Sequence, residues 1–142
     1  MVAVTQTQRR ALVVDDDEPI RTMLAKIVER ERFQVDTARD GAEAIEKLDA
    51  DGYSLVLLDL MMPKIDGYEV LRYMREHHAD LLPCTIIASA VPESEILRKA
   101  DLHVRAIHAK PFDMQQLLAD VRACAAEQEA GAVTAASEPL PS

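Results

Sequence analysis

Short apolar runs alternate with longer amphipathic stretches along most of this chain. Three of the runs are four residues long: Ala11 to Val14, Leu55 to Leu58 and Ala106 to Ala109. A run of this length that is bounded by turn residues is typical of a strand buried in a parallel sheet. The stretches between the runs carry apolar residues three and four positions apart, which is typical of helices that pack one face on a sheet.

Five pairs of a strand and a helix follow from this alternation. We expect strands over residues 10–15, 34–38, 55–59, 85–88 and 104–109. We expect helices over residues 18–32, from 40 onward, and over 67–77, 93–100 and 113–127. Three of these helices follow an aspartate that can cap the first turn: Asp17, Asp40 and Asp66.

Repeated strand–helix units leave few possible topologies. Short connections imply right-handed crossovers, with helices on both faces of one parallel sheet. A closed barrel of this kind needs eight units, so the five expected here favour an open sheet. The fold class is therefore α/β, doubly wound (βα)5, with the first strand placed between the second and the third. We expect this domain over 9–127, a flexible N-terminus over 1–8 and a disordered tail, rich in Ala, Gly, Ser and Pro, over 128–142.

Composition limits the possible function classes. The chain has 142 residues and a net charge of −9, which suits one globular domain and disfavours direct binding to nucleic acid. No apolar stretch approaches the roughly 20 residues of a membrane span, and residues 1–10 lack a signal-peptide core. We therefore expect a cytoplasmic protein with no membrane contact. Cys84 and Cys124 are far apart and lack the spacing of metal ligands, so we interpret them as reduced core thiols.

Charged residues stand at the ends of three expected strands. Asp15 and Asp16 stand at the end of the first, Asp59 at the end of the third, and Lys110 after the fifth. Because the carboxyl ends of parallel strands share one edge of the sheet, we expect these side chains to converge there. Two carboxylates about 4 Å apart repel each other by about 4 kcal/mol at an effective dielectric constant of about 20. One lysine cannot offset three carboxylates, so either a carboxyl is protonated or a cation binds, and oxygen ligands favour Mg²⁺.

Four short motifs mark these strand ends in a fixed order. They are Val13-Val14-Asp15-Asp16, then Asp59 with Met62-Pro63 and Asp66-Gly67 after it, then Ala88-Ser89-Ala90, then Lys110-Pro111-Phe112. The ordered set, which covers residues 10–126, resembles a two-component response-regulator receiver domain of the single-domain, stand-alone type. This resemblance implies a flavodoxin-like fold with a five-stranded parallel sheet in the order 2-1-3-4-5.

The resemblance also implies a phosphoacceptor and a metal site. Asp59 would accept a phosphoryl group from a phosphohistidine of a sensor histidine kinase or a histidine phosphotransfer protein. Asp15, Asp16, Asp59 and the backbone carbonyl of Met61 would hold Mg²⁺, which neutralises phosphoryl oxygens during a loose, in-line transfer. Such a protein would catalyse only its own phosphorylation and dephosphorylation, and would not be an enzyme acting on a separate substrate.

Two further residues would link phosphorylation to signalling. By the resemblance, Lys110 would pair with one phosphoryl oxygen, and Ser89 would donate its hydroxyl to another and draw the following loop inward. The family often has a cis bond at the step that is Lys110-Pro111 here. The face made by residues 93–100, 104–109 and 113–127 would then signal by contact with a downstream protein that the sequence does not identify. The same face is the first candidate for a homodimer interface.

Three residues depart from the family pattern or bear on its kinetics. The family usually has an aromatic residue three positions before the lysine, where this chain has Ile107. An aliphatic side chain cannot stack inward in the same way, so we expect a weakened switch and keep a phosphate shuttle or a non-switching binding module as alternatives. Met61 and Val91 occupy positions that line the route of hydrolytic water in the family, and both are apolar. We therefore expect slow self-dephosphorylation.

Two functions from other classes are less well supported by the residues. A phosphohydrolase with Asp59 as its nucleophile would need an acid two residues later to protonate the leaving alcohol, and that residue is Met61. A flavin- or nucleotide-binding module would need a glycine-rich loop after the first strand, where this chain has acidic residues.

Overall fold

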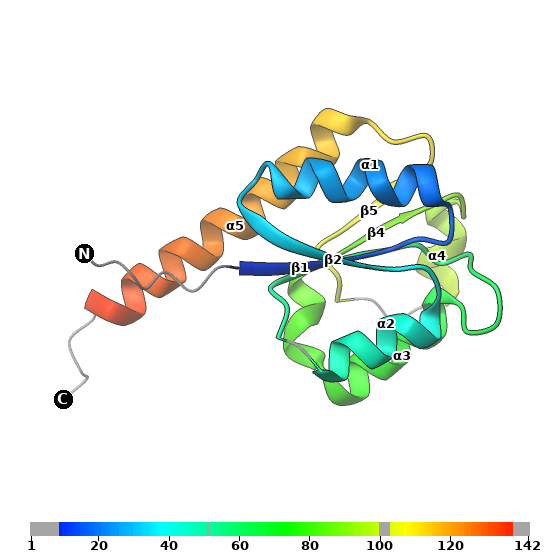
Figure 1. The fold of residues 1–142 in the computed structure, drawn as a ribbon, viewed down its shortest axis with the longest axis horizontal. Helices are drawn as coiled ribbons and strands as arrows, with labels where there is room; N and C mark the ends of the chain where they lie inside the picture. Colours follow the sequence, from blue (N-terminus) through cyan, green and yellow to red (C-terminus); the bar gives the residue numbers. More distant parts are fainter. Residues whose placement is uncertain (1–8, 51, 100–102, 138–142) are drawn as a thin grey trace.

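One parallel sheet contains every strand in the described part of the chain, which comprises residues 9–50, 52–99 and 103–137 of the computed structural model (Figure 1). The strands are β1 (Arg9–Val14), β2 (Phe33–Ala38), β3 (Leu55–Leu58), β4 (Thr85–Ser89) and β5 (Ala106–Ala109). Their order is β2-β1-β3-β4-β5, so β1 lies between β2 and β3. The predicted flavodoxin-like α/β fold is confirmed.

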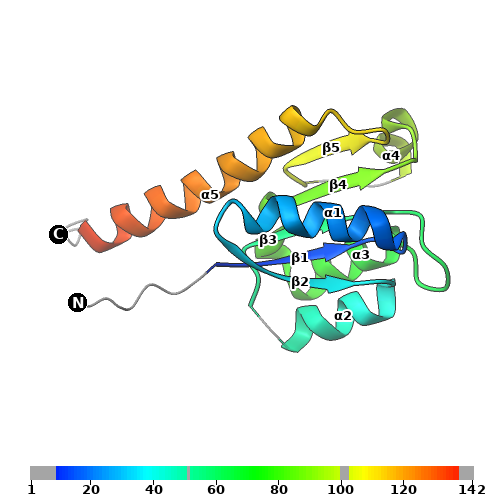
Figure 2. The same ribbon diagram turned by 45° about the horizontal axis from the view of Figure 1, so that its top comes forward.

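Helices cover both faces of the sheet (Figure 2). One face carries α1 (Glu18–Glu29) and α5 (Met114–Ser137), and the other carries α2 (Gly41–Ala50), α3 (Gly67–His77) and α4 (Glu93–Lys99). A 3-10 helix, η1 (Ala79–Cys84), connects α3 to β4. Among the described residues, none of the helices combines the length and the apolar character that crossing a bilayer requires.

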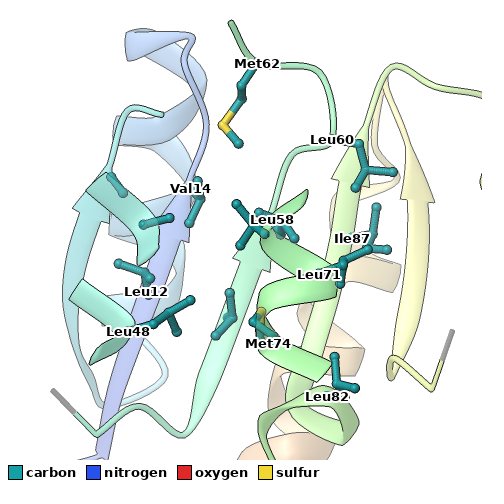
Figure 3. Close-up of a cluster of buried hydrophobic side chains, with 14 of the residues drawn as sticks. Leu12, Val14, Leu48, Leu58, Leu60, Met62, Leu71, Met74, Leu82 and Ile87 are labelled. Carbon is teal, nitrogen blue, oxygen red and sulfur yellow. The ribbon is translucent and has the colours of Figure 1, made fainter. Parts of the chain in front are cut away.

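Alternate residues of each strand face opposite layers of helices. In β1, Leu12 and Val14 join the apolar cluster beneath α2, α3 and α4, whereas Ala11 and Val13 join the cluster beneath α1 and α5. Figure 3 shows the first of these clusters, in which side chains from β1, β3 and β4 meet side chains from α2 and α3. Because both faces of the sheet are covered, its strands are apolar on both sides, which explains the unbroken hydrophobic runs in the sequence.

Helix α5 does not end near residue 127 as expected but continues to Ser137, and it projects beyond the sheet in Figure 2. The extension is rich in alanine, which has the highest helix propensity of any residue, and this outweighs the cost of about 1 kcal/mol for a glycine in a helix. The expected disordered tail is therefore helical over 128–137. Its remainder, 138–142, and the expected flexible N-terminus, 1–8, lie outside the described residues.

Other boundaries differ from the expectation by a few residues. Helix α1 ends at Glu29 rather than at 32, because the chain turns at Arg32, whose φ of 70° lies in the left-handed region. Strand β5 begins at Ala106 rather than at 104. The sequence pattern did not predict η1, whose last turn is closed by a hydrogen bond of 2.8 Å from the Thr85 hydroxyl to the Leu81 carbonyl.

Two leucines on helices provide a test of the packing. Leu48 on α2 is 2% exposed, whereas Leu97 on α4 is 59% exposed. Leu48→Ala leaves a cavity in the core, and we expect it to lower the free energy of unfolding by about 2 to 5 kcal/mol. Leu97→Ala removes little buried surface, so its effect should stay within about 0.5 kcal/mol. Urea denaturation measures both, and equal losses would contradict the packing described here.

Candidate functional site

Strand register places two aspartates side by side at the carboxyl edge of the sheet. Val14 pairs with Leu58, so Asp15 and Asp59 are the next residues on neighbouring strands. The backbone continues the pairing for one more step, since the Asp59 N–H donates to the Val14 carbonyl over 3.0 Å. The side chains of Asp15 and Asp59 are only 1% and 3% exposed. The packing of the sheet thus holds two carboxylates together, away from most of the solvent.

A third carboxylate completes an acidic cluster. One oxygen from each of Asp15, Asp16 and Asp59 lies within 4.8 Å of the other two. Asp16 is exposed, unlike its two neighbours. Buried like charges at this separation repel each other strongly. The three residues that the sequence predicted to converge are therefore together in the structure.

Lys110 reaches the same cluster from the end of β5, the outermost strand on the β4 side of the sheet. Ser89 pairs with Ala109, so Lys110 follows β5 at the edge where the acidic residues lie. Its ammonium nitrogen donates to Asp15 Oδ2 over 3.0 Å and lies 3.8 Å from Asp59 Oδ2. The peptide bond between Lys110 and Pro111 is cis, the isomer that the family resemblance implied. The predicted convergence of the lysine with the aspartates is therefore present.

Burial, followed by the charge of Asp15, raises the pKa of Asp59 above its ordinary value of 3.8. Three weaker effects oppose this rise: a hydrogen bond of 3.2 Å from the Met61 N–H, the charge of Lys110 and a hydrogen bond from the Ser89 hydroxyl. Because the pKa of Asp59 is raised overall, the hydrogen-bond donors and the lysine around it do not fully stabilise the charged carboxylate. An additional positive charge beside Asp59 would therefore be stabilising.

Ser89 already contacts the acidic cluster. It is 0% exposed, and its oxygen accepts long hydrogen bonds of 3.4 Å from the N–H groups of Leu60 and Val91. A hydrogen bond from Ser89 is also the weakest of the effects that lower the pKa of Asp59. The hydroxyl therefore connects the loop after β3, the loop after β4 and the carboxylate between them.

Local helix caps shape the loops that surround the site. The Asp17 side chain accepts from the Ile20 N–H over 3.0 Å, and that of Asp66 accepts from the Glu69 N–H over 3.0 Å. Both residues are N-caps, as predicted from the sequence. Asp40 likewise accepts from the Glu43 N–H over 2.8 Å.

Gly67 is required by a close approach that the sequence pattern did not reveal. A Cβ atom at this position would lie 2.3 Å from the Asp59 carbonyl oxygen and 2.5 Å from Leu60 Cα. Both of these atoms belong to the backbone, so they cannot move aside cheaply. The Gly67 N–H also donates to the Leu60 carbonyl over 3.0 Å. The start of α3 therefore packs directly on the segment that carries Asp59.

A second residue missed from the sequence is Arg21 on α1. Its guanidinium donates to the Asp15 backbone carbonyl over 2.9 Å, which ties the acidic loop to the helix that follows it. The Asp17 N–H also donates to Asp15 Oδ1 over 2.9 Å. The available signal was spacing: a helix that begins at residue 18 directs an arginine in its first turn back toward the loop before it.

A pocket of about 550 Å³ opens beside the acidic cluster. Its lining includes Asp16, Met61, Ala90 and Val91. Met61 is 59% exposed, whereas Val91 is 7% exposed. The two apolar residues that the sequence singled out for water access thus line one pocket together with a carboxylate of the cluster.

Ile107, the expected switch residue, lies in β5 and is half-buried. It packs against the apolar cluster beneath α2, α3 and α4. An aliphatic side chain in this place contributes packing but has no aromatic face.

The donor set fits a hard divalent cation. Asp15, Asp16 and Asp59 supply carboxylate oxygens only, and the Met61 backbone lies beside them, because its N–H contacts Asp59. Oxygen-only sets with room for water are typical of Mg²⁺ sites. The position of Asp16, at the border of the pocket, leaves one side of the cluster open to solvent.

Comparisons with known proteins agree on one family. The sequence model of the response regulator receiver domain matches residues 11–122. The chain is 37% identical over 114 residues to the response regulator MprA of Mycolicibacterium vanbaalenii, a match that covers 80% of this chain and 49% of that protein. The MprA protein of Mycobacterium tuberculosis is 36% identical over the same length, with 49% of that protein covered. The chain thus spans about half the length of the curated relatives that it matches.

Solved structures give the same result. The response regulator TrrA from Thermotoga maritima, in complex with Mg²⁺ and BeF, superposes with a TM-score of 0.70 at 32% identity, covering 82% of this chain and 98% of that one. A CheY-like receiver domain protein from Methanospirillum hungatei shares the fold with a TM-score of 0.77 at 24% identity, covering 88% and 99% of the two chains. Sequence, sheet order and edge chemistry lead to one conclusion: the chain belongs to the family of response regulator receiver domains.

Proposed function

We propose that this chain is a phosphoacceptor of a two-component signalling or phosphorelay system, and that Asp59 takes the phosphoryl group. The observation that carries the proposal is the position of the Asp59 carboxylate, which is held beside Asp15 and within 3.8 Å of Lys110 at the edge of the sheet. The donor would be the phosphohistidine of a sensor histidine kinase or of a histidine phosphotransfer protein. In the transfer, an Asp59 oxygen bonds to phosphorus while the bond from phosphorus to the histidine nitrogen breaks.

Mg²⁺ is part of this proposal. Asp15, Asp16, Asp59 and the Met61 carbonyl would hold the ion, and when bound it supplies positive charge to the transferring phosphoryl oxygens. TrrA, a relative with 32% identity, was crystallised with Mg²⁺ and BeF, which supports the same ion here. The acidic cluster holds its carboxylates in place before any ion arrives, because Asp15 and Asp59 are positioned by backbone pairing.

Lys110 and Ser89 would stabilise the phosphorylated form. The Lys110 ammonium already lies between Asp15 and Asp59, so a phosphoryl group on Asp59 would enter its reach. The Ser89 hydroxyl, whose interaction with the Asp59 carboxylate lowers the pKa of that group, would donate to a phosphoryl oxygen. Because this hydroxyl is already near, the change in the loop after β4 would be a reorientation of Ser89 more than a long inward movement.

Signalling would occur by contact with other proteins and not by direct binding to nucleic acid. The face made by α4, β5 and α5 would bind a downstream protein or a second copy of the chain. A phosphate shuttle, or a non-switching binding module, is the second candidate function, and the aliphatic Ile107 favours it, because the residue lacks the aromatic ring that rotates in the family. The protein would catalyse only its own phosphorylation and dephosphorylation, in the cytoplasm. A phosphohydrolase is disfavoured, because Met61 provides no acid.

Acetyl phosphate provides a direct test of the phosphoacceptor. With Mg²⁺ present, we expect one added phosphoryl group in the intact mass of the wild-type chain, and none in Asp59→Asn or after the metal is chelated. Asp66→Asn is the matched control, because asparagine caps a helix about as well as aspartate, and it should be phosphorylated like the wild type. A phosphoryl adduct that persists in Asp59→Asn would contradict the proposed role of Asp59.

Burial of Asp59 and, after it, the charge of Asp15 predict a pH-dependent stability. Since the pKa of Asp59 is raised above 3.8 in the folded state, the native protein binds this proton more tightly than the unfolded chain does. Wild-type stability therefore falls as the pH rises from about 4 to the raised pKa, and the loss is complete at higher pH. Without metal, Asp59→Asn should be more stable than the wild type at pH 7, by about 1 to 2 kcal/mol, with little difference below pH 4.

Chemical denaturation with and without Mg²⁺ measures this difference. Saturating Mg²⁺ should stabilise the wild type by about 2.7 kcal/mol at a hundredfold excess over the dissociation constant, and should stabilise Asp59→Asn much less. Asp66→Asn should follow the wild type in both conditions. A wild-type protein that gains no stability from Mg²⁺ would argue against the metal site.

The apolar side chains beside the cluster predict a long-lived phosphorylated form. Met61 and Val91 line the pocket next to Asp16 and offer no polar group to orient a hydrolytic water. We expect the acyl phosphate to last minutes or longer in Mg²⁺ buffer, and Met61→Asn combined with Val91→Thr to shorten that lifetime several-fold. The control is Leu97→Asn on the surface of α4. A wild-type lifetime of seconds that neither substitution changes would rule out this explanation.

A further inference from the structure

Two cysteines that are distant in sequence meet at the end of β4 opposite to the acidic cluster. Cys84 is the last residue of η1 and directly precedes β4, whereas Cys124 lies on α5. Both are free thiols. Cys84 is partly exposed, and Cys124 is 0% exposed. Their separation along the chain did not reveal this proximity, and the interpretation as reduced core thiols did not include it.

One amide group bridges the two sulfur atoms. The Gln128 side-chain nitrogen lies 3.4 Å from the Cys84 sulfur and 3.2 Å from the Cys124 sulfur, and 2.6 Å from the Ser54 carbonyl oxygen. Because one amide nitrogen contacts both sulfur atoms, the two thiols are close neighbours. A disulfide forms between cysteines that are placed side by side in this way once their sulfur atoms turn toward each other.

A fixed positive charge stands beside the pair. The Arg105 guanidinium donates to the Pro83 carbonyl over 2.9 Å and to Glu127 Oε2 over 2.9 Å, so it lies beside the residue that precedes Cys84. Together with the hydrogen bond from Cys124, which is the largest effect, and that from Gln128, the guanidinium lowers the pKa of Cys84 to about 6. The pKa of Cys124 is raised, first by the same thiol–thiol hydrogen bond and then by burial.

These contacts give the two thiols different chemistry. Cys84 combines partial exposure with an electropositive neighbour, which are the conditions for a reactive thiolate. Cys124 is buried, its sulfur lies 3.6 Å from the Ser54 carbonyl oxygen as a donor, and it shares the Gln128 contact with Cys84. An attacking cysteine followed by a second cysteine that closes the bond is the arrangement of a thiol pair that responds to oxidants.

We propose that Cys84 and Cys124 form a peroxide-reactive pair that closes into an intramolecular disulfide. In the first step the Cys84 thiolate attacks one oxygen of hydrogen peroxide, so that a sulfur–oxygen bond forms, the oxygen–oxygen bond breaks and the departing hydroxide takes up a proton to become water. In the second step the Cys124 sulfur attacks the Cys84 sulfur, a sulfur–sulfur bond forms, and hydroxide leaves with the Cys124 proton as a second water. The two thiols lose two electrons in total, and peroxide gains them.

The bond would join α5 to the residue that precedes β4. It lies outside the acidic cluster and uses none of its residues. The proposal therefore does not depend on phosphorylation of Asp59, and Asp59→Asn should form the disulfide at the wild-type rate.

The test treats the reduced full chain with a small excess of hydrogen peroxide at neutral pH, then denatures it and alkylates the remaining thiols. We expect the intact mass to show the loss of two hydrogen atoms and no alkyl groups, in a monomer that dithiothreitol restores. Peptide mapping should find residues 84 and 124 linked. Two alkylated cysteines after treatment, or a disulfide between two chains, would overturn the proposal.

Single variants assign the order of attack. In Cys124→Ala, oxidation of Cys84 should stop at the sulfenic acid, because the second thiol is absent, and dimedone should then bond to the Cys84 sulfur while the oxygen leaves as water. In Cys84→Ala, the buried Cys124 should react about tenfold more slowly, or not at all. Circular dichroism checks that both variants are folded, and the wild-type result stands without either of them. Faster oxidation of Cys124 than of Cys84 would contradict the proposed mechanism.

Discussion

Repulsion between two buried carboxylates is the constraint on which the rest of this structure depends. Asp15 and Asp59 cannot move apart unless β1 and β3 separate, because the residues before them are paired in the sheet and packed on both faces. Two neighbouring residues offset part of this charge: Lys110, which follows β5, and Ser89, the last residue of β4. The pKa of Asp59 nevertheless stays raised, so its charged carboxylate lowers the stability of the folded state and favours a bound cation. Such a cost is typical of functional sites and rare elsewhere in a core.

Much of the fold could be predicted from the sequence, because the relevant signals are local. Apolar runs that end on charged residues identified the strands and their common edge, and Asp17 and Asp66 identified helix starts. The end of α5 could not be predicted in the same way, because the Ala- and Ser-rich composition of its last turns suits a helix as well as a disordered tail. The short η1 was missed because six residues that include a proline carry no periodic pattern.

The charged residues of the candidate site could be predicted from the sequence, but the packing contacts around them could not. Residue type and strand position were enough to bring Lys110 to the aspartates, because the carboxyl ends of β1, β3 and β5 share one edge of the sheet. The role of Gly67 depends on how closely α3 approaches the Asp59 backbone, and that distance follows from packing rather than from pattern. The contacts of Cys84 and Cys124 with one amide join residues on separate elements, and sequence spacing carries no information about them. Arg21 is an intermediate case, because its place in the first turn of α1 is a local signal for its contact with the Asp15 carbonyl.

Strand β4 separates two reactive centres by its whole length. Ser89, at one end, contacts Asp59, and Cys84 directly precedes the other end. Groups at opposite ends of a rigid strand do not compete for space, so an acyl phosphate and a disulfide would be able to coexist. A single small domain would then have four covalent forms, and a partner that contacts α5 could distinguish an oxidised, phosphorylated molecule from one that carries only one of the two marks.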